Sequence, residues 1–401
     1  MSEGRLRVLV VTELYPNQIS PTFAIYNGIQ FAALSRLCDV DVRATVPWFP
    51  GARRFKDRSA AGQFADLPAE EEVRGVRVRH PRFLFIPKIG QPLSPLLYAA
   101  SIWPGVRSLR GQVDVVLGCW AFPDGLAAIM LARLLGAAAA VKVHGSDLNV
   151  LPRDPKLRAL MRWGLPRADR LIAVSRPLGE RAVELGVPRD RVEVVANGID
   201  RDLFHPRDRG QARAKLGLPD GKLLLYIGRL DRAKGVNDLA EAFTRLAPAH
   251  PDLRLAIVGG GPEQAACQAL AAAHPGRVFA TGALPMGDLP DWIAACDILT
   301  LPSWNEGTPN VLLEALASGR RVVATRVGGI PDVVSDPKLG ELVEARDVPA
   351  LAEALARAAH APYDPQEMTV AAPHSWPESA ARLRDVLGAA VAHRRQREGH
   401  A

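Results

Sequence analysis

Cysteine is scarce in this sequence, and none of it has a metal-binding spacing. The 401 residues include four cysteines, at positions 38, 119, 267 and 296, most of them within apolar runs. Scattered cysteines of this kind are typical of proteins that fold in a reducing compartment. The sequence therefore excludes a disulfide scaffold and a cysteine-ligated zinc centre.

Long hydrophobic runs are also missing. The longest apolar stretch, 125–141, is interrupted by Arg133 and is shorter than the ~20 residues that a membrane-spanning helix needs. The first residues, 1–7, lead directly into the apolar run 8–12 rather than into a secretory leader. We therefore expect a cytoplasmic protein, with the inner face of the membrane as a candidate peripheral location.

Acidic residues are in deficit in the first half of the chain. Residues 1–200 hold 27 Lys and Arg against 19 Asp and Glu, whereas residues 201–401 hold 23 against 24. One interpretation is an arginine-rich compositional bias. The other is a basic face for an anionic membrane surface or an anionic acceptor. No nucleic-acid-binding motif accompanies the charge, so we expect no nucleic-acid partner.

Apolar runs of strand length alternate with amphipathic segments of helix length, and this pattern starts twice. The predicted strands of the first half are 6–12, 40–45, 113–117, 138–143, 170–174 and 192–195, and those of the second half are 223–227, 253–258, 278–280, 298–301 and 321–325. Alternation of this kind predicts an α/β protein with parallel sheets. We expect two Rossmann-like domains, 1–200 and 223–374, facing a central cleft and joined by a linker, 201–222. Residues 48–112 give no clear pattern.

The stretch SWNEGTPNVLLEAL, residues 303–316, places two carboxylates eight residues apart. Thr308 is the predicted N-cap and Pro309 the first residue of a helix that ends at Gly319. The N–H groups of Gly307, Asn310 and Val311 at this helix start favour an anion, while Glu306 and Glu314 can accept hydrogen bonds from hydroxyls. An anion flanked by hydroxyls on two sides describes a nucleotide-sugar. The alternative is an ordinary capped helix with two glutamates.

Two further turns follow predicted strands in the second half. YIGRLDRAKG, 226–235, carries Arg229 and Lys234, and two cations five residues apart suit a diphosphate. A surface loop is the alternative interpretation of either cation alone. VGGGPEQ, 258–264, and VGGIPDVV, 327–334, are glycine-rich turns that can bring backbone near a ligand.

The segment KVHGSDLN, 142–149, places His144 and Asp147 just beyond the predicted strand 138–143. A single histidine is more often structural than catalytic. Its position at a strand end, where open α/β sheets bind ligands, favours a functional role.

Taken in order, the segments 226–235, 259–262, 302–315 and 327–331 resemble the retaining glycosyltransferases of family 4, which have the GT-B fold. The resemblance implies that Arg229 and Lys234 bind the donor diphosphate and that Glu314 binds the ribose. It implies that Glu306 contacts the transferred sugar, that His144 lies beside the reacting centre, and that the nucleobase lies near 282–284. Sugar and phosphate would meet the backbone after Glu306, at Gly307, Thr308, Pro309, Asn310 and Val311. The helix 375–395 resembles the family's last helix, which crosses back to the first domain.

One departure from the family concerns the loop after the first strand. Many members have Gly-Gly there, whereas TELYPNQISPTFAIYNGIQ has none and resembles a subgroup active in cell-surface polysaccharide synthesis. Thr22 and Asp147 are the candidates for the acceptor side. We expect no metal and no cofactor, because Arg229, Lys234 and helix dipoles can offset the charge of the leaving diphosphate. Asp-Val-Asp at 39–41 is interpreted as edge polar residues of the second strand.

The expected function is transfer of a hexosyl group from a nucleoside-diphosphate sugar to a hydroxyl of a glycan or lipid-linked acceptor, with retention of configuration. Two alternatives remain open. A nucleotide-sugar 2-epimerase of the same fold would turn over its substrate without an acceptor. A non-catalytic nucleotide-sugar-binding partner would bind the donor and leave it intact.

Overall fold

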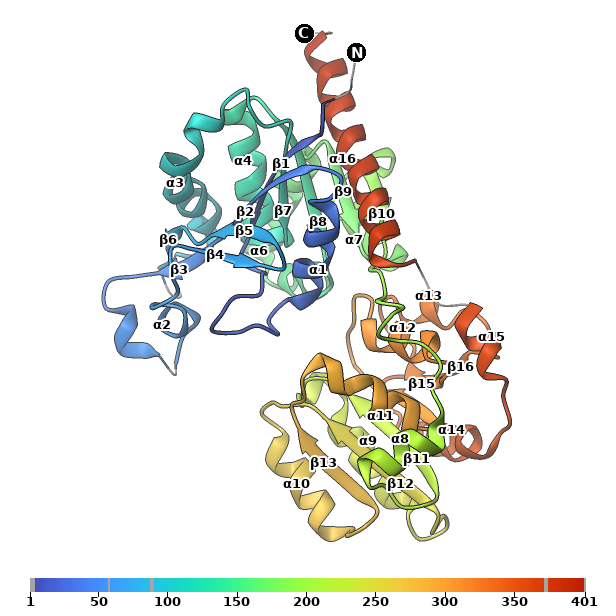
Figure 1. Ribbon diagram of the computed structural model, residues 1–401. Helices are drawn as coiled ribbons and strands as arrows, with labels where there is room; N and C mark the ends of the chain where they lie inside the picture. The colour runs from blue at the N-terminus through green and yellow to red at the C-terminus, as the bar shows by residue number, and fades with distance from the viewer. Residues whose placement is uncertain (1–3, 57, 87–89, 371–373, 400–401) are drawn as a thin grey trace. The chain divides into compact units, whose positions relative to one another are not determined.

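The chain divides into two compact α/β units, each with its own sheet and core (Figure 1). The computed structural model describes residues 4–56, 58–86, 90–370 and 374–399. The N-terminal unit comprises Met1–Gly198 together with Trp376–Ala401, and the C-terminal unit comprises Ile199–Ser375. The last helix, α16 (Trp376–Gly399), packs on α1 (Ile25–Leu34) of the N-terminal unit. One hydrogen bond between them joins the Gln30 amide to the Ser379 hydroxyl at 3.0 Å.

The N-terminal sheet has the order β10-β9-β8-β7-β1-β2-β5-β4. Every neighbouring pair is parallel except β4 and β5, which are antiparallel. Its strands are β1 (Arg7–Thr12), β2 (Asp39–Ala44), β4 (Glu70–Val73), β5 (Val76–Arg79), β7 (Val115–Cys119), β8 (Ala138–Val143), β9 (Arg170–Ala173) and β10 (Val192–Val194). The central strand β1 is apolar because helices cover both of its faces, which is usual for a parallel sheet.

The two faces of this sheet have separate hydrophobic cores. Val8 and Val10 face α1 and α16, whereas Leu9 and Val11 face the other side, in agreement with the two-residue period of a strand. The helices of the other face are α3 (Ser94–Val106), α4 (Leu126–Leu135), α6 (Pro155–Gly164) and α7 (Arg176–Glu184).

Residues 48–112, which gave no clear pattern, contain one regular helix, α3, which has Pro104 in its interior, and otherwise short elements. A separate two-stranded sheet pairs β3 (Val46–Trp48) with β6 (Arg82–Leu84), and α2 (Ala60–Gln63) is a single turn. Such elements are too short for a helical or strand period to be recognised in the sequence.

The C-terminal sheet is entirely parallel, with the order β13-β12-β11-β14-β15-β16. Its strands are β11 (Lys222–Ile227), β12 (Leu253–Val258), β13 (Val278–Gly282), β14 (Ile298–Leu301), β15 (Arg321–Thr325) and β16 (Gly340–Val343). Numbered within the unit, this is the strand order 3-2-1-4-5-6 of a doubly wound Rossmann sheet.

Its helices are amphipathic, and α9 shows why they form where they do. In α9 (Val236–Leu246) the buried residues Val236, Leu239, Phe243 and Leu246 recur at intervals of three and four and face the sheet. The other helices are α8 (Arg209–Leu216), α10 (Gln264–Ala273), α11 (Leu289–Ala295), α12 (Asn310–Ala317), α13 (Ile330–Val333), α14 (Val348–His360) and α15 (Pro365–Val370).

Two local expectations need correction. The segment 201–222 was predicted as a linker, but Phe204 and Ala212 are buried in the C-terminal core, and Arg213 of α8 binds Asp297 at 2.7 Å. It is therefore a packed part of the C-terminal unit. The strand β2 lies between β1 and β5 rather than at an edge, and its Asp41 binds Arg43 at 2.8 Å.

In both sheets the direction in which successive strands are added reverses at the first strand of the unit. The reversal falls between β1 and β7 in the N-terminal unit and between β11 and β14 in the C-terminal unit. Ligands of open α/β sheets bind beyond the carboxyl ends of the strands at this point. We therefore expect a ligand site in the loops there.

None of the helices in the described residues combines the length and the apolar character needed to cross a bilayer.

Candidate functional site

The loops after β11 and β14 meet at the switch point of the C-terminal unit. The Lys234 ammonium donates to the Glu306 carboxylate, with 2.8 Å between Nζ and Oε1. The same Glu306 oxygen accepts a hydrogen bond of 2.7 Å from the Ser303 hydroxyl. Lys234 keeps a third of its side chain exposed while Glu306 is nearly buried, so the pair presents its cation to the solvent side.

Gly235 allows the Lys234 loop to approach β14 this closely. Its φ is +69°, and a Cβ at this position would lie 1.9 Å from the carbonyl oxygen of Pro302. Only glycine fits such a left-handed and crowded position. The backbone N–H of Trp304 donates to the Ala233 carbonyl at 2.8 Å, which connects the two loops.

A third loop, after β15, supports the backbone of Glu306. Gly328 has a φ of +52°, and a Cβ there would lie 1.9 Å from the Glu306 carbonyl oxygen. The next residue, Gly329, donates its N–H to the Gly307 carbonyl at 2.7 Å. The Val-Gly-Gly turn is thus explained by its contact with the Glu306 loop.

Helix α12 starts one residue later than expected. Pro309, not Thr308, occupies the N-cap position in an extended conformation, and the helix begins at Asn310. The cap must have non-helical φ and ψ, and the extended Pro309 meets this requirement where Thr308 was predicted to. Gly307 and Pro309 are buried at this helix start, and Thr308 and Val311 are half-buried.

Glu314 lies in the second turn of α12. It is 4% exposed, and Asn310 one turn earlier is 6% exposed. A buried carboxylate is held only where polar partners surround it, so Glu314 is not a solvated surface glutamate.

Arg229, just beyond β11, remains outside the Lys234–Glu306 pair. Its side chain is 68% exposed and contacts Asp231 at 3.5 Å. Its backbone carbonyl accepts the hydroxyl proton of the buried Tyr226 at 2.8 Å. The loop is therefore fixed while the guanidinium stays accessible to an anion.

In the N-terminal unit, Asp147 organises the loop after β8. Its carboxylate accepts hydrogen bonds from the N–H groups of His144 at 3.1 Å, Gly145 at 2.7 Å and Ala121 at 3.1 Å. Asp147 has no exposed surface, and burial raises its pKa to about 6. The Asp147 carboxylate thus connects the backbone that follows β7 to the backbone that follows β8.

His144 lies on this loop with an unsatisfied nitrogen. Its Nε2 is buried and has no hydrogen-bond partner among the described residues. Burial, with the nearby Lys142 charge, holds the pKa of His144 well below its usual range, so the ring is neutral. The ring stacks on Trp120 with 6.2 Å between centroids, and Trp120 has a strained φ of +116°. Unsatisfied polar atoms and strained backbone gather at functional sites.

Sequence reasoning missed two carboxyl groups beside this loop. Asp124 accepts the Glu13 N–H at 2.8 Å, and its other oxygen is buried without a partner among the described residues. Burial raises the pKa of Glu13 to about 7 and that of Asp124 well above its usual range. The available signal was an acidic residue directly after the first strand.

A cavity of about 110 Å³ opens beside Glu13. Tyr15, whose hydroxyl is buried without a partner among the described residues, contributes to its wall. Thr22 is exposed in the turn before α1 and does not line this cavity. The segment 282–284 starts at the last residue of β13, and Ala283 is exposed between the half-buried Gly282 and Leu284.

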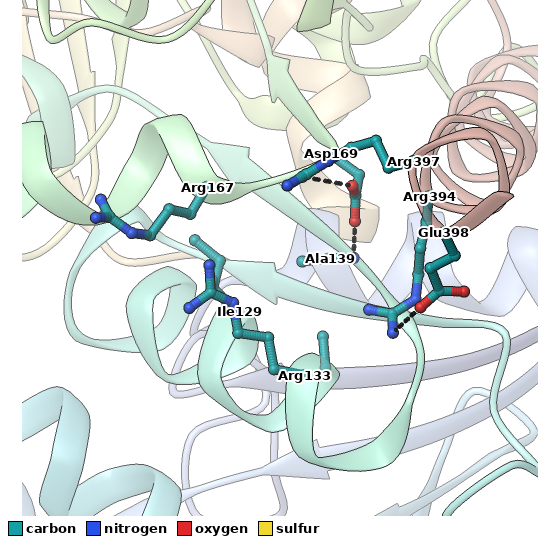
Figure 2. A pocket seen from close by; sticks show the side chains of 9 residues that line it. Ile129, Arg133, Ala139, Arg167, Asp169, Arg394, Arg397 and Glu398 are labelled. Carbon is teal, nitrogen blue, oxygen red and sulfur yellow. Dashed lines mark hydrogen bonds and ion pairs between the residues drawn. The ribbon is translucent and has the colours of Figure 1, made fainter. Parts of the chain in front are cut away.

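A second pocket, of about 260 Å³, lies at the opposite edge of the N-terminal sheet, where β8 and β9 begin (Figure 2). Its lining residues are Ile129, Ala132, Arg133, Ala139, Arg167, Asp169, Arg394, Arg397 and Glu398. Arg394 binds Glu398 at 2.5 Å, and Arg397 lies 3.9 Å from Asp169. Among the described residues, neither Arg133 nor Arg167 pairs with a carboxylate, so the pocket is basic.

Comparison with known proteins gives two family matches. The profile described as Glycosyltransferase Family 4 matches residues 36–203, and the profile described as Glycosyl transferases group 1 matches residues 221–360. Each profile falls almost entirely within one structural unit.

Individual relatives match over most of their length. The chain is 31% identical to a GDP-mannose-dependent alpha-(1-6)-phosphatidylinositol monomannoside mannosyltransferase of Mycolicibacterium smegmatis, over 85% of this chain and 88% of that protein. It is 28% identical to TuaC of Bacillus subtilis, a glycosyltransferase assigned to teichuronic acid biosynthesis, over 88% and 90%. Among solved structures, HepE of Anabaena in complex with UDP covers 98% of this chain and 99% of its own, with a TM-score of 0.66 and 18% identity. That likeness shows the GT-B fold.

Proposed function

Because the chain belongs to the glycosyltransferases of family 4, we propose that it transfers a hexosyl group from a nucleoside-diphosphate sugar to a hydroxyl group. The acceptor is a glycan or a lipid-linked saccharide of the cell surface, in line with the name of the Bacillus relative. Transfer retains the configuration of the sugar and needs neither metal nor cofactor.

The observation that carries this proposal is the pairing of Lys234 with Glu306 at the switch point of the C-terminal sheet. The Glu306 carboxylate can accept hydrogen bonds from hydroxyl groups, and the Lys234 ammonium can bind an anion. One hydrogen bond joins the two side chains. A sugar joined to a diphosphate needs these two groups in this proximity. Glu314, buried in the following helix, is the group proposed for the ribose.

The chemistry follows from the charges around the leaving group. As the bond between sugar and diphosphate breaks, negative charge grows on the phosphate oxygens. Lys234, the exposed Arg229 guanidinium and the start of α12 stabilise that charge. Retention then requires the acceptor to attack from the face that the diphosphate leaves, and the protein contributes positioning.

We assign His144, Glu13 and Asp124 to the reacting centre and the acceptor side. The neutral His144 ring offers its unsatisfied Nε2 to the sugar, where it steadies developing charge through a hydrogen bond. Glu13, with a pKa of about 7, can exchange a proton near neutral pH, which suits contact with an acceptor hydroxyl. Asp147, because it is buried against three backbone N–H groups, acts as a positioning residue for His144 rather than as an acceptor ligand.

The test is a thermal-shift screen of nucleoside diphosphates and their sugars, followed by product analysis. A ligand at 100 times its Kd adds about 2.7 kcal/mol to the unfolding free energy, which is easily measured. Each stabilising donor is then incubated with and without candidate acceptors. Turnover that requires an acceptor supports transfer, whereas conversion of the donor alone to its 2-epimer identifies an epimerase. Binding without any turnover identifies a non-catalytic partner.

We further propose that the basic pocket of Figure 2 contacts an anionic membrane surface. The exposed Leu134 is adjacent to Arg133 in the sequence, and the Arg167 guanidinium lies over the exposed Trp163 ring at 4.3 Å. Arginine beside an interfacial tryptophan suits lipid headgroups. Sedimentation with phosphatidylglycerol vesicles should recover the protein, and vesicles of phosphatidylcholine should not. The double variant Arg133→Glu, Arg167→Glu should stay in the supernatant, whereas Arg245→Glu should sediment normally. Equal recovery of all three proteins would refute the membrane contact.

A further inference from the structure

We propose that His250, Asp252 and His360 bind one transition-metal ion of the Zn²⁺ class, in a site separate from the one that transfers the sugar. One ligand atom from each side chain lies within 4.8 Å of the others. His250 and Asp252 lie just before β12, and His360 is the last residue of α14. Two imidazoles and one carboxylate are a ligand set that Zn²⁺ accepts.

The site lies at the amino ends of the strands of the C-terminal sheet, whereas the Lys234–Glu306 pair lies beyond their carboxyl ends. Asp252 precedes β12, whereas Lys234 follows β11, the neighbouring parallel strand. A strand of six residues separates the two edges by about 20 Å. The ion therefore takes no part in the transfer reaction, and the inference is independent of the proposed function.

One ring nitrogen of His360 is held by the backbone, which leaves the other for a ligand. Its Nδ1 lies 2.9 Å from the Ala356 carbonyl oxygen, which can only accept a hydrogen bond. Its Nε2 is directed at the Asp252 Oδ2, 3.4 Å away. A cation between Nε2 and Oδ2 would bind to both atoms. A metal-binding histidine usually donates its second nitrogen to a carbonyl in this way.

The spacing of these two atoms suits tetrahedral coordination. Zinc bonds of about 2.0–2.2 Å to nitrogen and oxygen, at a tetrahedral angle, place neighbouring ligand atoms about 3.3–3.5 Å apart. The observed separation of 3.4 Å falls in this interval. The centroids of the His250 and His360 rings lie 5.5 Å apart, and a ligand atom of His250 lies within 4.8 Å of those of the other two side chains. The fourth position is left for water.

The backbone and the helices favour a cation here. The His250 carbonyl accepts from Leu253 N–H at 3.1 Å, and the Asp252 carbonyl accepts from Lys222 N–H at 2.9 Å, which fixes the loop. His360 ends α14, and the His250 N–H bonds to the Leu246 carbonyl at the end of α9. Both helices therefore direct their negative ends toward the ion.

The arginines near the site bind backbone carbonyls or another carboxylate. The Arg277 guanidinium binds the carbonyls of Ala247 at 2.9 Å and His250 at 2.7 Å. Arg254 binds the Pro251 carbonyl at 2.7 Å, and Arg357 pairs with Glu341 at 3.1 Å. Arg277 and Arg254 reduce the affinity for a dication, so we infer a single site of moderate strength that links α14 to the start of β12.

The test uses the full chain without a histidine tag, stripped of metal and titrated with Zn²⁺ by calorimetry. Co²⁺ serves as a second probe, because its visible absorption reports tetrahedral nitrogen and oxygen coordination. The four cysteines are buried and do not compete in the folded protein. His360→Ala and Asp252→Asn remove proposed ligands, and His205→Ala removes an exposed histidine outside the site.

We expect one equivalent of Zn²⁺ to bind, to raise the Tm, and to give a tetrahedral Co²⁺ spectrum. His360→Ala and Asp252→Asn should each lower the affinity for Zn²⁺ at least tenfold and lose the tetrahedral Co²⁺ spectrum. His205→Ala should keep the Zn²⁺ affinity and the spectrum of the wild type. Absence of binding by the wild type, or equal binding by all four proteins, would overturn the site. Neither result depends on transferase activity, so it leaves the proposed function untouched.

Discussion

Lys234 and Glu306 are 72 residues apart in the sequence and form a hydrogen-bonded ion pair of 2.8 Å at the carboxyl edge of the C-terminal sheet. The proposed phosphate ligand and the proposed sugar ligand thus neutralise each other in the protein without substrate. We expect a bound diphosphate to draw Lys234 toward the phosphate, and the hydroxyls of the sugar then to compensate Glu306.

The Glu306→Gln variant should separate the sugar from the nucleotide. Loss of the carboxylate leaves Lys234 without its 2.8 Å counter-ion, so its charge is fully available to phosphate. We expect affinity for the free nucleoside diphosphate to be kept or increased, while activity falls and the choice between sugars becomes less strict. Calorimetry with diphosphate and with the matching sugar donor measures both. A large loss of diphosphate affinity would contradict this assignment.

Glu314→Gln should instead weaken binding of the nucleoside diphosphate itself, because the ribose is present with or without the sugar. An unpaired buried polar group at a hydroxyl site costs about 1–3 kcal/mol, which corresponds to roughly 5–150-fold in Kd. Glu353→Gln, at a glutamate 73% exposed on α14, is the matched control and should bind normally. Unchanged diphosphate binding by Glu314→Gln would mean that this glutamate only stabilises its helix.

Arg229→Ala and Lys234→Ala should each weaken diphosphate binding while the unfolding transition stays that of a folded protein. A hydrogen bond to a charged group is worth about 1.5–3 kcal/mol, so each Kd should rise by at least about tenfold. Arg232→Ala is the control from the same loop, because the Arg232 guanidinium lies over the Trp304 ring at 5.6 Å. If both variants bind like Arg232→Ala, the diphosphate is held elsewhere.

His144→Ala should lower turnover far more than donor affinity. The reason is that its unsatisfied Nε2 is proposed for the reacting centre and not for the nucleotide. Because burial keeps the pKa of His144 well below its usual range, turnover should show no inflection near the ordinary histidine pKa that this variant removes. Parallel losses of Tm and turnover, with normal activity per folded molecule, would instead make His144 structural.

The contribution of Glu13 to stability should decrease as pH rises toward neutrality, because burial raises the pKa of Glu13 from 4.5 to about 7. Between these values the folded state holds a proton that the unfolded state releases, so folding is favoured at lower pH and loses this contribution as pH passes through about 7. The upper limit for Glu13 is about 3 kcal/mol.

Urea unfolding of Glu13→Gln between about pH 5 and about pH 8 measures this contribution. The variant should have a shallower pH dependence than the wild type and than Glu353→Gln. Some dependence should remain, because the pKa values of Asp124 and Asp147 are raised in the same direction. Identical slopes in all three proteins would show that Glu13 titrates as an exposed carboxyl.

The regular elements were predictable because their periods are local. The expected strands 138–143 and 253–258 coincide with β8 and β12, and the alternation of strands with helices predicts that the sheets are parallel. The short strands β3 and β6 were not predictable, since their stability comes from pairing with each other rather than from a local pattern.

The sequence indicates the candidate residues of the site but not how they pair. The sequence predicted Lys234 and Glu306 as ligands of different parts of a donor, and only folding brings Ser303 and Lys234 to the same oxygen. The raised pKa of Glu13 depends on burial beside Asp124, 111 residues away. Nothing local distinguishes His250 or His360 from a surface histidine.

The most direct test of the account compares Lys234→Ala, Glu306→Gln and the wild type by calorimetry, with one nucleoside diphosphate and its sugar donor. The account predicts that Lys234→Ala loses affinity for both ligands. It predicts that Glu306→Gln loses only the extra affinity that the sugar gives over the free diphosphate. Equal losses for both ligands in both variants would show that the pair acts as one structural unit and would contradict the division between phosphate and sugar.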